Sequence, residues 1–304
     1  MNDQTFLILG ASGLIGEMIS KDLQGKAPWI GTTFSKSRPQ LTPLDLFNSS
    51  AVENLISRVK PAYVILGMNL GGGVSLCEKD PALAKRYHFE LTKNVASICQ
   101  SHGAKFIYIS TECVFDGVKE IVTEEEPVHP INVYGQCKVL SEYWIRTNLT
   151  SYLIIRTTSV FGWQPDTKSP NAVMSLYFAL SKKQNIFAPT YRFSTPTYVG
   201  DLSKAIIELC LNNANGTYHV VGPTWINRYE WLKKTCQYLG WNEQYLKSEE
   251  QSPKEGVRYP SKVRLDTTKF RTTFKTKLHS LEDSLAMLKS QIENSDLKKT
   301  SHAS

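Results

Sequence analysis

The chain has 304 residues, 41% of them hydrophobic and 21% charged, so it can bury a full core as one large α/β domain or two smaller ones. The net charge of +7 is spread along the sequence without a basic block, which argues against nucleic acid as a partner and suits an anionic or neutral small molecule. The longest apolar runs have the length of strands, so we expect no membrane span.

The compartment and the redox state follow from what the sequence lacks. No charged leader followed by an apolar segment opens the chain, so we expect a cytoplasmic protein. The six cysteines form neither a CxxC pair nor the histidine-spaced pattern of a zinc site. We therefore expect reduced thiols and no bound metal.

A glycine-rich turn joins the first strand to the first helix. Residues 5–9 form an apolar run typical of a strand buried on both faces, and a helix is expected to end at about Gln24. Glycines between them let the backbone approach a pyrophosphate at the helix N-terminus. The spacing is GxxGxxG rather than GxGxxG, and such a turn can be purely structural, but its place between strand and helix favours a dinucleotide site. The predicted cofactor contacts in this turn are Gly10, Ser12, Gly13, Leu14, Ile15 and Gly16.

The segment after the second strand indicates which dinucleotide binds. The strand covers residues 29–34 and is followed by Ser35, Lys36 and Arg38, with no acid between Asp22 and Asp45. A basic residue here accommodates the 2′-phosphate of NADP, whereas NAD sites place an acid there. The alternative is that the two cations are simply solvated. We predict NADPH, with NADH less favoured, and expect Asp45 and the neighbouring Leu46 near the adenine.

A further strand, Tyr63–Leu66, opens into a loop, residues 67–73, that contains four glycines. The missing side chains let a ligand lie against the backbone, so we place the nicotinamide side there, with Gly67 and Met68 as contacts. A long helix is expected over residues 81–101. Strands and helices thus alternate through this half, which predicts an α/β fold with a doubly wound parallel sheet.

The catalytic candidates follow the strand at residues 106–109. Tyr134 and Lys138 are four residues apart, so they share one face of a helix, and the ammonium group is expected to lower the pKa of the phenol. Such a tyrosine can transfer a proton near neutral pH. Thr111 lies at the carboxyl end of the strand, where ligands of open α/β sheets bind, and can hold the carbonyl oxygen that receives the proton.

A second YxxxK, Tyr229 to Lys233, lies in an amphipathic helix without a strand end before it. We interpret that copy as core residues plus a solvated face.

The remaining chain alternates less regularly. A strand at residues 152–155 is followed by a polar loop at 163–171 and a helix at 172–183. The loop at 191–197 holds Arg192 among aromatic residues, which suits a sugar phosphate or a nucleotide base, although an ordinary surface loop remains the alternative. Further elements are expected at 199–211, 217–221 and 229–239, and disorder is expected from about Glu293 to Ser304.

Taken in order, five motifs resemble those of extended short-chain dehydrogenases/reductases, and more narrowly of the dTDP-4-dehydrorhamnose reductase-like group. The resemblance spans roughly residues 4 to 275 and rests on GASGLIG at residues 10–16, STECVFDG at 110–117, NVYGQCK at 132–138, RTTSVFG at 156–162 and PTYVGDL at 196–202. It implies Thr111 as the hydroxyl residue, Tyr134 as the proton donor, and Lys138 as the residue that binds the ribose and tunes the tyrosine.

The resemblance also implies a Rossmann core with a smaller α/β C-terminal substrate lobe. We expect the core over residues 1–160 plus about 195–221, and the lobe over about 161–194 and 222–290. Tyr134 and Lys138 would also contact the cofactor. The expected substrate contacts are Thr111, Glu112, Ser159, Asn171 and Arg192.

Three sites depart from the pattern of the group. Ser159 stands where these reductases usually carry an aromatic residue, and His88 replaces a common helix asparagine. Residues 67–69 read Gly-Met-Asn where the group has Asn-Ala-Ala. Dehydration is not expected, because related dehydratases need two adjacent carboxylates where this chain has Glu112 and Cys113.

The sequence therefore predicts an NADPH-dependent reductase of a nucleotide-linked 4-keto-6-deoxy sugar, with Tyr134 as proton donor. Two alternatives stay open: an NAD(P)-dependent sugar-nucleotide epimerase, and a cofactor-binding regulatory subunit resembling that of methionine adenosyltransferase. A nucleotide sugar is the expected partner, and the sequence leaves a homodimer open.

Overall fold

The computed structural model describes residues 4–34, 38–251 and 256–300. Its centre is a seven-stranded parallel sheet in the order β12-β7-β5-β4-β1-β2-β3. The order reverses between β1 and β4, and ligands of doubly wound folds bind at such a switch point. The strands are β1 (Phe6–Leu9), β2 (Trp29–Thr33), β3 (Thr42–Pro43), β4 (Tyr63–Leu66), β5 (Lys105–Thr111), β7 (Tyr152–Thr157) and β12 (Gly216–His219).

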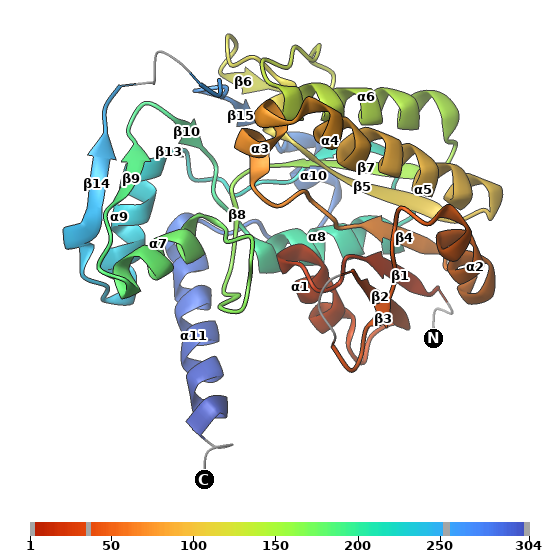
Figure 1. Cartoon of the computed structure of the whole chain (residues 1–304), viewed down its shortest axis with the longest axis horizontal. Coiled ribbons are helices and arrows are strands. Elements are labelled where there is room, and N and C mark those ends of the chain that lie inside the picture. The colour runs from red at the N-terminus through yellow and green to blue at the C-terminus, as the bar shows by residue number, and fades with distance from the viewer. Residues whose placement is uncertain (1–3, 35–37, 252–255, 301–304) are drawn as a thin grey trace.

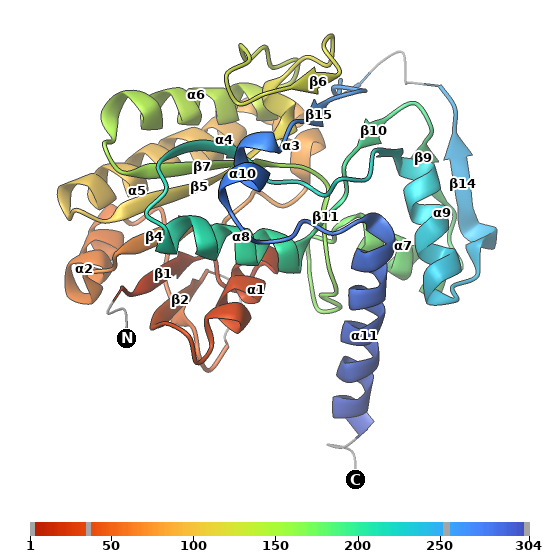
Figure 2. The same ribbon diagram turned by 180° about the vertical axis from the view of Figure 1, so that it is seen from behind.

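Helices cover both faces of this sheet, as Figures 1 and 2 show from opposite sides. One face is covered by α1 (Leu14–Leu23), α8 (Val199–Leu211) and α10 (Thr268–Thr273). The other is covered by α2 (Ser49–Val59), α5 (Leu91–Ser101) and α6 (Val133–Asn148). All residues of β1 and β4 are buried, because apolar side chains on both faces of these strands meet a helix layer.

The helix predicted over residues 81–101 is interrupted by a π-helical turn. It consists of α4 (Pro81–Lys85), the π-helix η1 (Arg86–Glu90) and α5, and the short helix α3 (Gly73–Lys79) precedes it. Such π-helical turns often occur at functional sites. Here the turn contains His88, which is buried.

A smaller lobe has its own apolar core around the fully buried Trp231. Its helices are α7 (Ala172–Ser181), α9 (Arg228–Leu239) and α11 (Leu281–Thr300), and β9 (Ile186–Pro189) pairs in parallel with β14 (Leu246–Glu249). In Figure 1 these elements lie to the left of the main sheet. The role of this lobe in substrate binding stays a prediction.

Short elements join the two parts. The pairs are β8 (Val160–Phe161) with β11 (Thr197–Tyr198), β10 (Phe193–Ser194) with β13 (Ile226–Asn227), and β6 (Ile121–Val122) with β15 (Arg264–Leu265). The 3-10 turns are η2 (Glu112–Val114) and η3 (Glu243–Tyr245).

Two expectations about the C-terminal part are wrong. The predicted lobe included α10, but Phe270 of this helix is completely buried in the core cluster formed with β1 and α8. The disorder predicted from Glu293 to Ser304 differs from the structure as far as Thr300, because α11 continues to that residue, and residues 301–304 lie outside the described residues. Residues 281–300 contain neither proline nor glycine, and once a helix is nucleated each further residue adds a hydrogen bond, so α11 continues past the packed Leu285 and Leu288.

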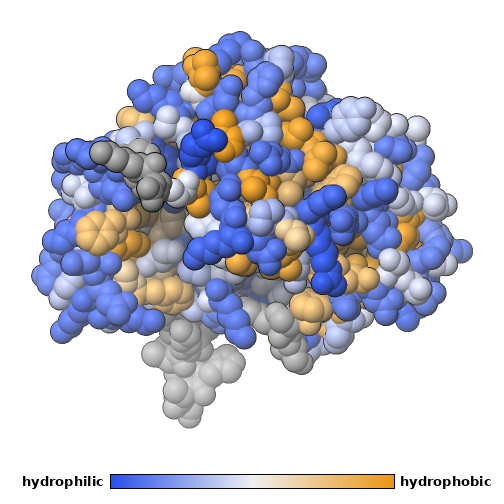
Figure 3. Space-filling view, turned by 45° about the horizontal axis from the view of Figure 1, so that its top comes forward, coloured by the Kyte–Doolittle hydropathy of each residue, from blue (hydrophilic) through white to orange (hydrophobic). Residues whose placement is uncertain are grey.

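Among the residues that the structure describes, no helix is long and apolar enough to cross a membrane. The face drawn in Figure 3 is largely hydrophilic, and its apolar side chains occur in small groups between polar ones. Such a pattern is ordinary for a protein surface in water.

Candidate active site

The glycine-rich turn has the geometry that a pyrophosphate requires. Gly10 has φ +90°, which side chains rarely allow, and a Cβ on Gly16 would lie 2.5 Å from the carbonyl oxygen of Gly10. Gly13 precedes α1 without a side-chain cap, so within the part of the chain that the structure describes no capping side chain occupies the backbone N–H groups of the first turn. A dinucleotide phosphate fits this helix N-terminus.

The carboxyl ends of β4, β5 and β7 and the start of α6 converge on one pocket of about 250 Å³. Thr111 ends β5, whereas Tyr134 and Lys138 stand on the first turns of α6, which Asn132 caps by accepting the N–H of Gly135 at 2.8 Å. The residues from the predicted site that line this pocket are Ile15, Gly67, Met68, Thr111, Glu112, Tyr134, Lys138 and Ser159.

Lys138 is buried and does not contact the phenol oxygen directly. Its ammonium donates to the carbonyl oxygen of Ile109 at 2.8 Å and lies 4.6 Å from the ring centre of Tyr108 and 5.6 Å from that of Tyr134. Burial lowers the pKa of Lys138 to about 8, and the charge of Glu142 opposes that shift. At neutral pH the group is therefore still mainly cationic.

The expected lowering of the Tyr134 pKa is wrong. Burial raises the pKa of this phenol well above its ordinary value, and the nearby Cys113 raises it further. The ammonium of Lys138 lies 5.6 Å from the ring centre of Tyr134, and burial outweighs the effect of its charge on the phenol. Tyr134 is consequently protonated at neutral pH, which is the state that a proton donor needs.

The hydroxyl of Thr111 already has two partners. Its Oγ1 donates to Oε2 of Glu112 at 2.7 Å and accepts the backbone N–H of Cys113 at 3.2 Å. The second bond caps the turn η2 and fixes the end of β5. To donate to a substrate oxygen, the hydroxyl must rotate away from Glu112.

A buried polar network beneath the pocket was missed in the sequence. Glu142 of α6 binds Arg156 of β7 at 2.7 Å and accepts the hydroxyl of Ser110 at 2.6 Å. The signal was the spacing of Lys138 and Glu142, four residues apart on one helix face. Because the network ties α6 to β5 and β7, it holds the two sides of the pocket together.

His88 also borders the site. Its ring meets that of Tyr134 edge to face, with centres 5.0 Å apart, and its buried Nε2 has no hydrogen-bond partner among the described residues. Burial lowers the pKa of His88 to about 3, and the charge of Lys138 lowers it further, so the imidazole is neutral.

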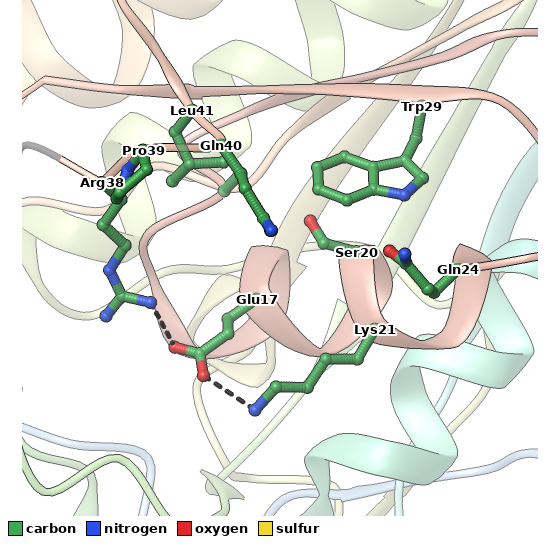
Figure 4. A pocket seen from close by; sticks show the side chains of 10 residues that line it. Glu17, Ser20, Lys21, Gln24, Trp29, Arg38, Pro39, Gln40 and Leu41 are labelled. Atoms are coloured by element: carbon green, nitrogen blue, oxygen red, sulfur yellow. Dashed lines mark hydrogen bonds and ion pairs between the residues drawn. The ribbon is translucent and has the colours of Figure 1, made fainter. Parts of the chain in front are cut away.

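The segment predicted to bind the 2′-phosphate is only partly described. Ser35 and Lys36 lie outside the described residues. Arg38 donates to Glu17 at 3.2 Å and to Asp166 at 2.9 Å, in a cavity of about 330 Å³ beside α1. Figure 4 shows Arg38 and Lys21 both pointing at the carboxylate of Glu17.

The other predicted cofactor contacts have local partners. Asp45 is exposed and accepts the N–H of Phe47 at 2.9 Å, whereas Leu46 is buried in the core. Ser12 accepts the hydroxyl of Thr33 at 3.1 Å, and Leu14 begins α1. Their contacts with a cofactor remain predictions.

The remaining substrate candidates lie around the smaller lobe. Asn171 caps α7 by accepting two backbone N–H groups and donates to the carbonyl of Gly162 at 2.9 Å. This capping accounts for the residue without a ligand, and its substrate contact remains a prediction. Arg192 lies over the ring of Tyr259, 3.8 Å from its centre.

Residues 4–293 match the family described as the RmlD substrate binding domain. The chain belongs to this family. The predicted family and the predicted Rossmann-type fold are therefore confirmed.

This RmlD-family chain is similar to several known proteins. One is the crystal structure of dTDP-4-dehydrorhamnose reductase from Bacillus anthracis in complex with NADP, with a TM-score of 0.81 and 26% identity over 94% of this chain and 98% of that one. In sequence it is 28% identical over 276 residues to Methionine adenosyltransferase 2 subunit beta of Rattus norvegicus, covering 88% of this chain and 81% of that protein. It is 25% identical over 291 residues to the probable low-salt glycan biosynthesis reductase Agl14 of Haloferax volcanii, covering 92% and 96%.

Proposed function

We propose that this RmlD-family protein is an NADPH-dependent reductase of a nucleotide-linked keto sugar, with 4-keto-6-deoxy sugars as its substrate class. The observation that carries the proposal is that Thr111, Tyr134 and Lys138 line one pocket with Gly67 and Met68, at the edge of the sheet where the glycine-rich turn lies. The similar dTDP-4-dehydrorhamnose reductase binds NADP. Its activity and cofactor support the same assignment here.

The residues of this chain fit a dinucleotide. The turn at Gly10 and Gly16 leaves a space that a Cβ would fill, and the uncapped start of α1 offers N–H groups to phosphates. Glycine at position 67 lets a ring lie against the backbone at the end of β4. We therefore assign the phosphates to the turn and the nicotinamide to the pocket.

The reduction requires a hydride and a proton. The bound nicotinamide supplies the hydride to the carbonyl carbon. Tyr134 donates its phenolic proton to the carbonyl oxygen as negative charge develops there. Thr111 orients that oxygen by a hydrogen bond once its hydroxyl leaves Glu112, and the cationic Lys138 stabilises the tyrosinate that remains.

The test is NADPH consumption with a dTDP-linked and a UDP-linked 4-keto-6-deoxy sugar. We expect one reduced sugar for each NADPH oxidised with at least one of them. Interconversion of sugars without net NADPH consumption would identify an epimerase instead. The absence of both reactions with either carrier would refute the proposed chemistry.

A second candidate function is a cofactor-binding regulatory subunit. It is favoured by the 28% identity to Methionine adenosyltransferase 2 subunit beta. In that case a methionine adenosyltransferase would co-purify with the chain, and NADPH would bind without turnover of any keto sugar.

The role of Tyr134 as proton donor has its own test. Reductase activity that is retained after Tyr134→Phe would argue against this role.

A homodimer and a cytoplasmic location remain predictions. The exposed Leu140 and Tyr143 on α6 offer an apolar surface for a second copy. Light scattering coupled to gel filtration would measure the mass of the particle directly.

A further inference from the structure

Two arginines lie opposite one another on an antiparallel strand pair. β10 and β13 pair with Phe193 opposite Asn227, so the next position places Arg192 opposite Arg228. The backbone N–H of Arg228 donates to the carbonyl of Arg192 at 3.0 Å, which continues the ladder. Residues at directly opposed positions have Cβ atoms about 5 Å apart. The Cβ atoms of Arg192 and Arg228 are therefore neighbours on the strand pair.

No carboxylate among the described residues forms an ion pair with either arginine. Aromatic rings support them instead: the guanidinium carbon of Arg192 lies 3.8 Å from the ring centre of Tyr259, and that of Arg228 lies 4.7 Å from the ring of Trp231. These contacts orient the cations without cancelling their charge. Like charges that lie directly opposite one another destabilise a strand pair, so this arrangement is unfavourable for stability.

The repulsion between the two arginines affects the pKa of Arg228. Burial lowers the pKa of its guanidinium to about 9, the charge of Arg192 also lowers it, and Glu112 acts in the opposite direction. The carboxylate of Glu112 is held by the hydroxyl of Thr111 at 2.7 Å rather than by an arginine. An anion bound between the two guanidinium groups would remove the repulsion.

The arginine pair lies beside the catalytic pocket. Nη2 of Arg228 donates to Oγ of Ser159 at 3.4 Å, and Ser159 lines the same pocket as Thr111 and Tyr134. Ser159 has φ +48°, which non-glycine residues rarely adopt, and its hydroxyl donates to Ser194 at 3.0 Å. One wall of the pocket thus contains the hydroxyl of Ser159, which is hydrogen-bonded to the guanidinium group of Arg228.

We propose that Arg192 and Arg228 bind an oxyanion of the substrate, a phosphate or a carboxylate, close to the carbonyl that is reduced. The proposal rests on the proposed function, because it concerns the nucleotide-linked keto sugar. Two planar guanidinium groups can hold several oxygens of one oxyanion with charge-assisted hydrogen bonds. The oxyanion has two sources, the diphosphate linkage and a carboxylate on the sugar ring. Because Arg228 contacts Ser159 at the pocket wall, we expect the bound oxyanion to be the one of these two that lies nearer the reacting carbon.

The experiment measures binding without turnover. Wild type and Arg228→Gln, each saturated with NADP⁺, are titrated calorimetrically with dTDP, UDP, UDP-glucose and UDP-glucuronate, none of which has a keto group. UDP-glucuronate differs from UDP-glucose by one carboxylate. Arg192→Gln is a second variant, and Arg58→Gln, which removes an exposed charge on α2, is the matched control.

We expect each pocket variant to weaken binding of the oxyanion ligand by about tenfold to a hundredfold, the effect of one charge-assisted contact. An equal loss for all bound nucleotides identifies the diphosphate, and a loss confined to UDP-glucuronate identifies the carboxylate. NADPH affinity and the melting temperature of the ligand-free variants should not fall. If Arg228→Gln fails to fold, the binding measurements on Arg192→Gln test the proposal.

Unchanged affinities in both variants, or a wild type that binds none of the four probes, would overturn the proposal. If the proposed reductase function is wrong, the measurements give a different result. In that case oxyanion binding would still depend on the two arginines, while no keto sugar would consume NADPH.

Discussion

Glu142 and Arg156 form an ion pair inside the protein, with Nη2 of Arg156 2.7 Å from Oε2 of Glu142 and both side chains almost completely buried. Nε of the same arginine contacts both carboxylate oxygens, at 3.0 and 3.3 Å. The hydrogen bonds hold the pKa of Glu142 below its usual value despite the opposing effect of burial. The pair therefore keeps its charges at neutral pH and joins α6 to β7 below the pocket.

Glu142→Gln should strongly destabilise the protein, because Arg156 would remain buried without a counter-charge. We expect a loss of about 3 to 5 kcal/mol in the free energy of unfolding, measured with urea. The double variant Glu142→Gln with Arg156→Met should recover part of this loss, since no charge is then stranded. A single variant as stable as the wild type would show that the pair contributes nothing.

Tyr134→Phe should lower the turnover number by about a hundredfold to ten-thousandfold, because the carbonyl oxygen loses its proton donor. The affinity for NADPH, measured by fluorescence titration, should change little, since the phenyl ring keeps the packing against His88. Tyr229→Phe is the matched control, because that tyrosine belongs to the second YxxxK on α9. Full activity of Tyr134→Phe would contradict the mechanism.

Stability should fall when the pH drops below about 6.5, because two buried histidines must stay neutral in the folded state. Burial lowers the pKa values of His88 and His219 to about 3, so between pH 3 and 6.5 the unfolded chain binds more protons than the folded one. Each histidine should cost at most about 1.4 kcal/mol per pH unit in this window.

Urea unfolding at a series of pH values would measure this slope. His219→Gln should flatten it. An equal slope in wild type and His219→Gln would disprove the assignment to that histidine.

NADPH should bind more tightly than NADH, by about tenfold to a hundredfold, if Arg38 contacts the 2′-phosphate. Arg38→Ala should abolish this preference, and added salt should reduce it because the contact is electrostatic. Arg38 forms ion pairs with Glu17 and Asp166, so a phosphate must compete with two carboxylates. Asp166→Asn should therefore increase the affinity for NADPH more than that for NADH.

Isothermal titration of both cofactors into the wild type, Arg38→Ala, Asp166→Asn and Lys21→Ala would give the ratio of NADPH affinity to NADH affinity for each of the four proteins. Lys21→Ala serves as the control, because Lys21 also binds Glu17 but belongs to the exposed side of α1. Equal affinities for NADPH and NADH in the wild type would show that Arg38 does not read the phosphate.

Local pattern in the sequence was enough for the nucleotide-binding half and the catalytic candidates. Apolar runs, a glycine-rich turn and the four-residue spacing of Tyr134 and Lys138 depend on contacts within a few residues, and these repeat with the periods of strand and helix. The strand before Thr111 and the helix that carries Tyr134 consequently lie where they were expected.

Only the tertiary structure decided which distant charges meet. Arg38 and Asp166 are 128 residues apart in the chain, and the arginines at 192 and 228 face each other because β10 pairs with β13. Burial, too, depends on the whole fold, which is why the pKa of Tyr134 is raised although a lysine stands four residues away. Charge interactions and desolvation depend on distance in space, and a local sequence pattern does not contain that distance.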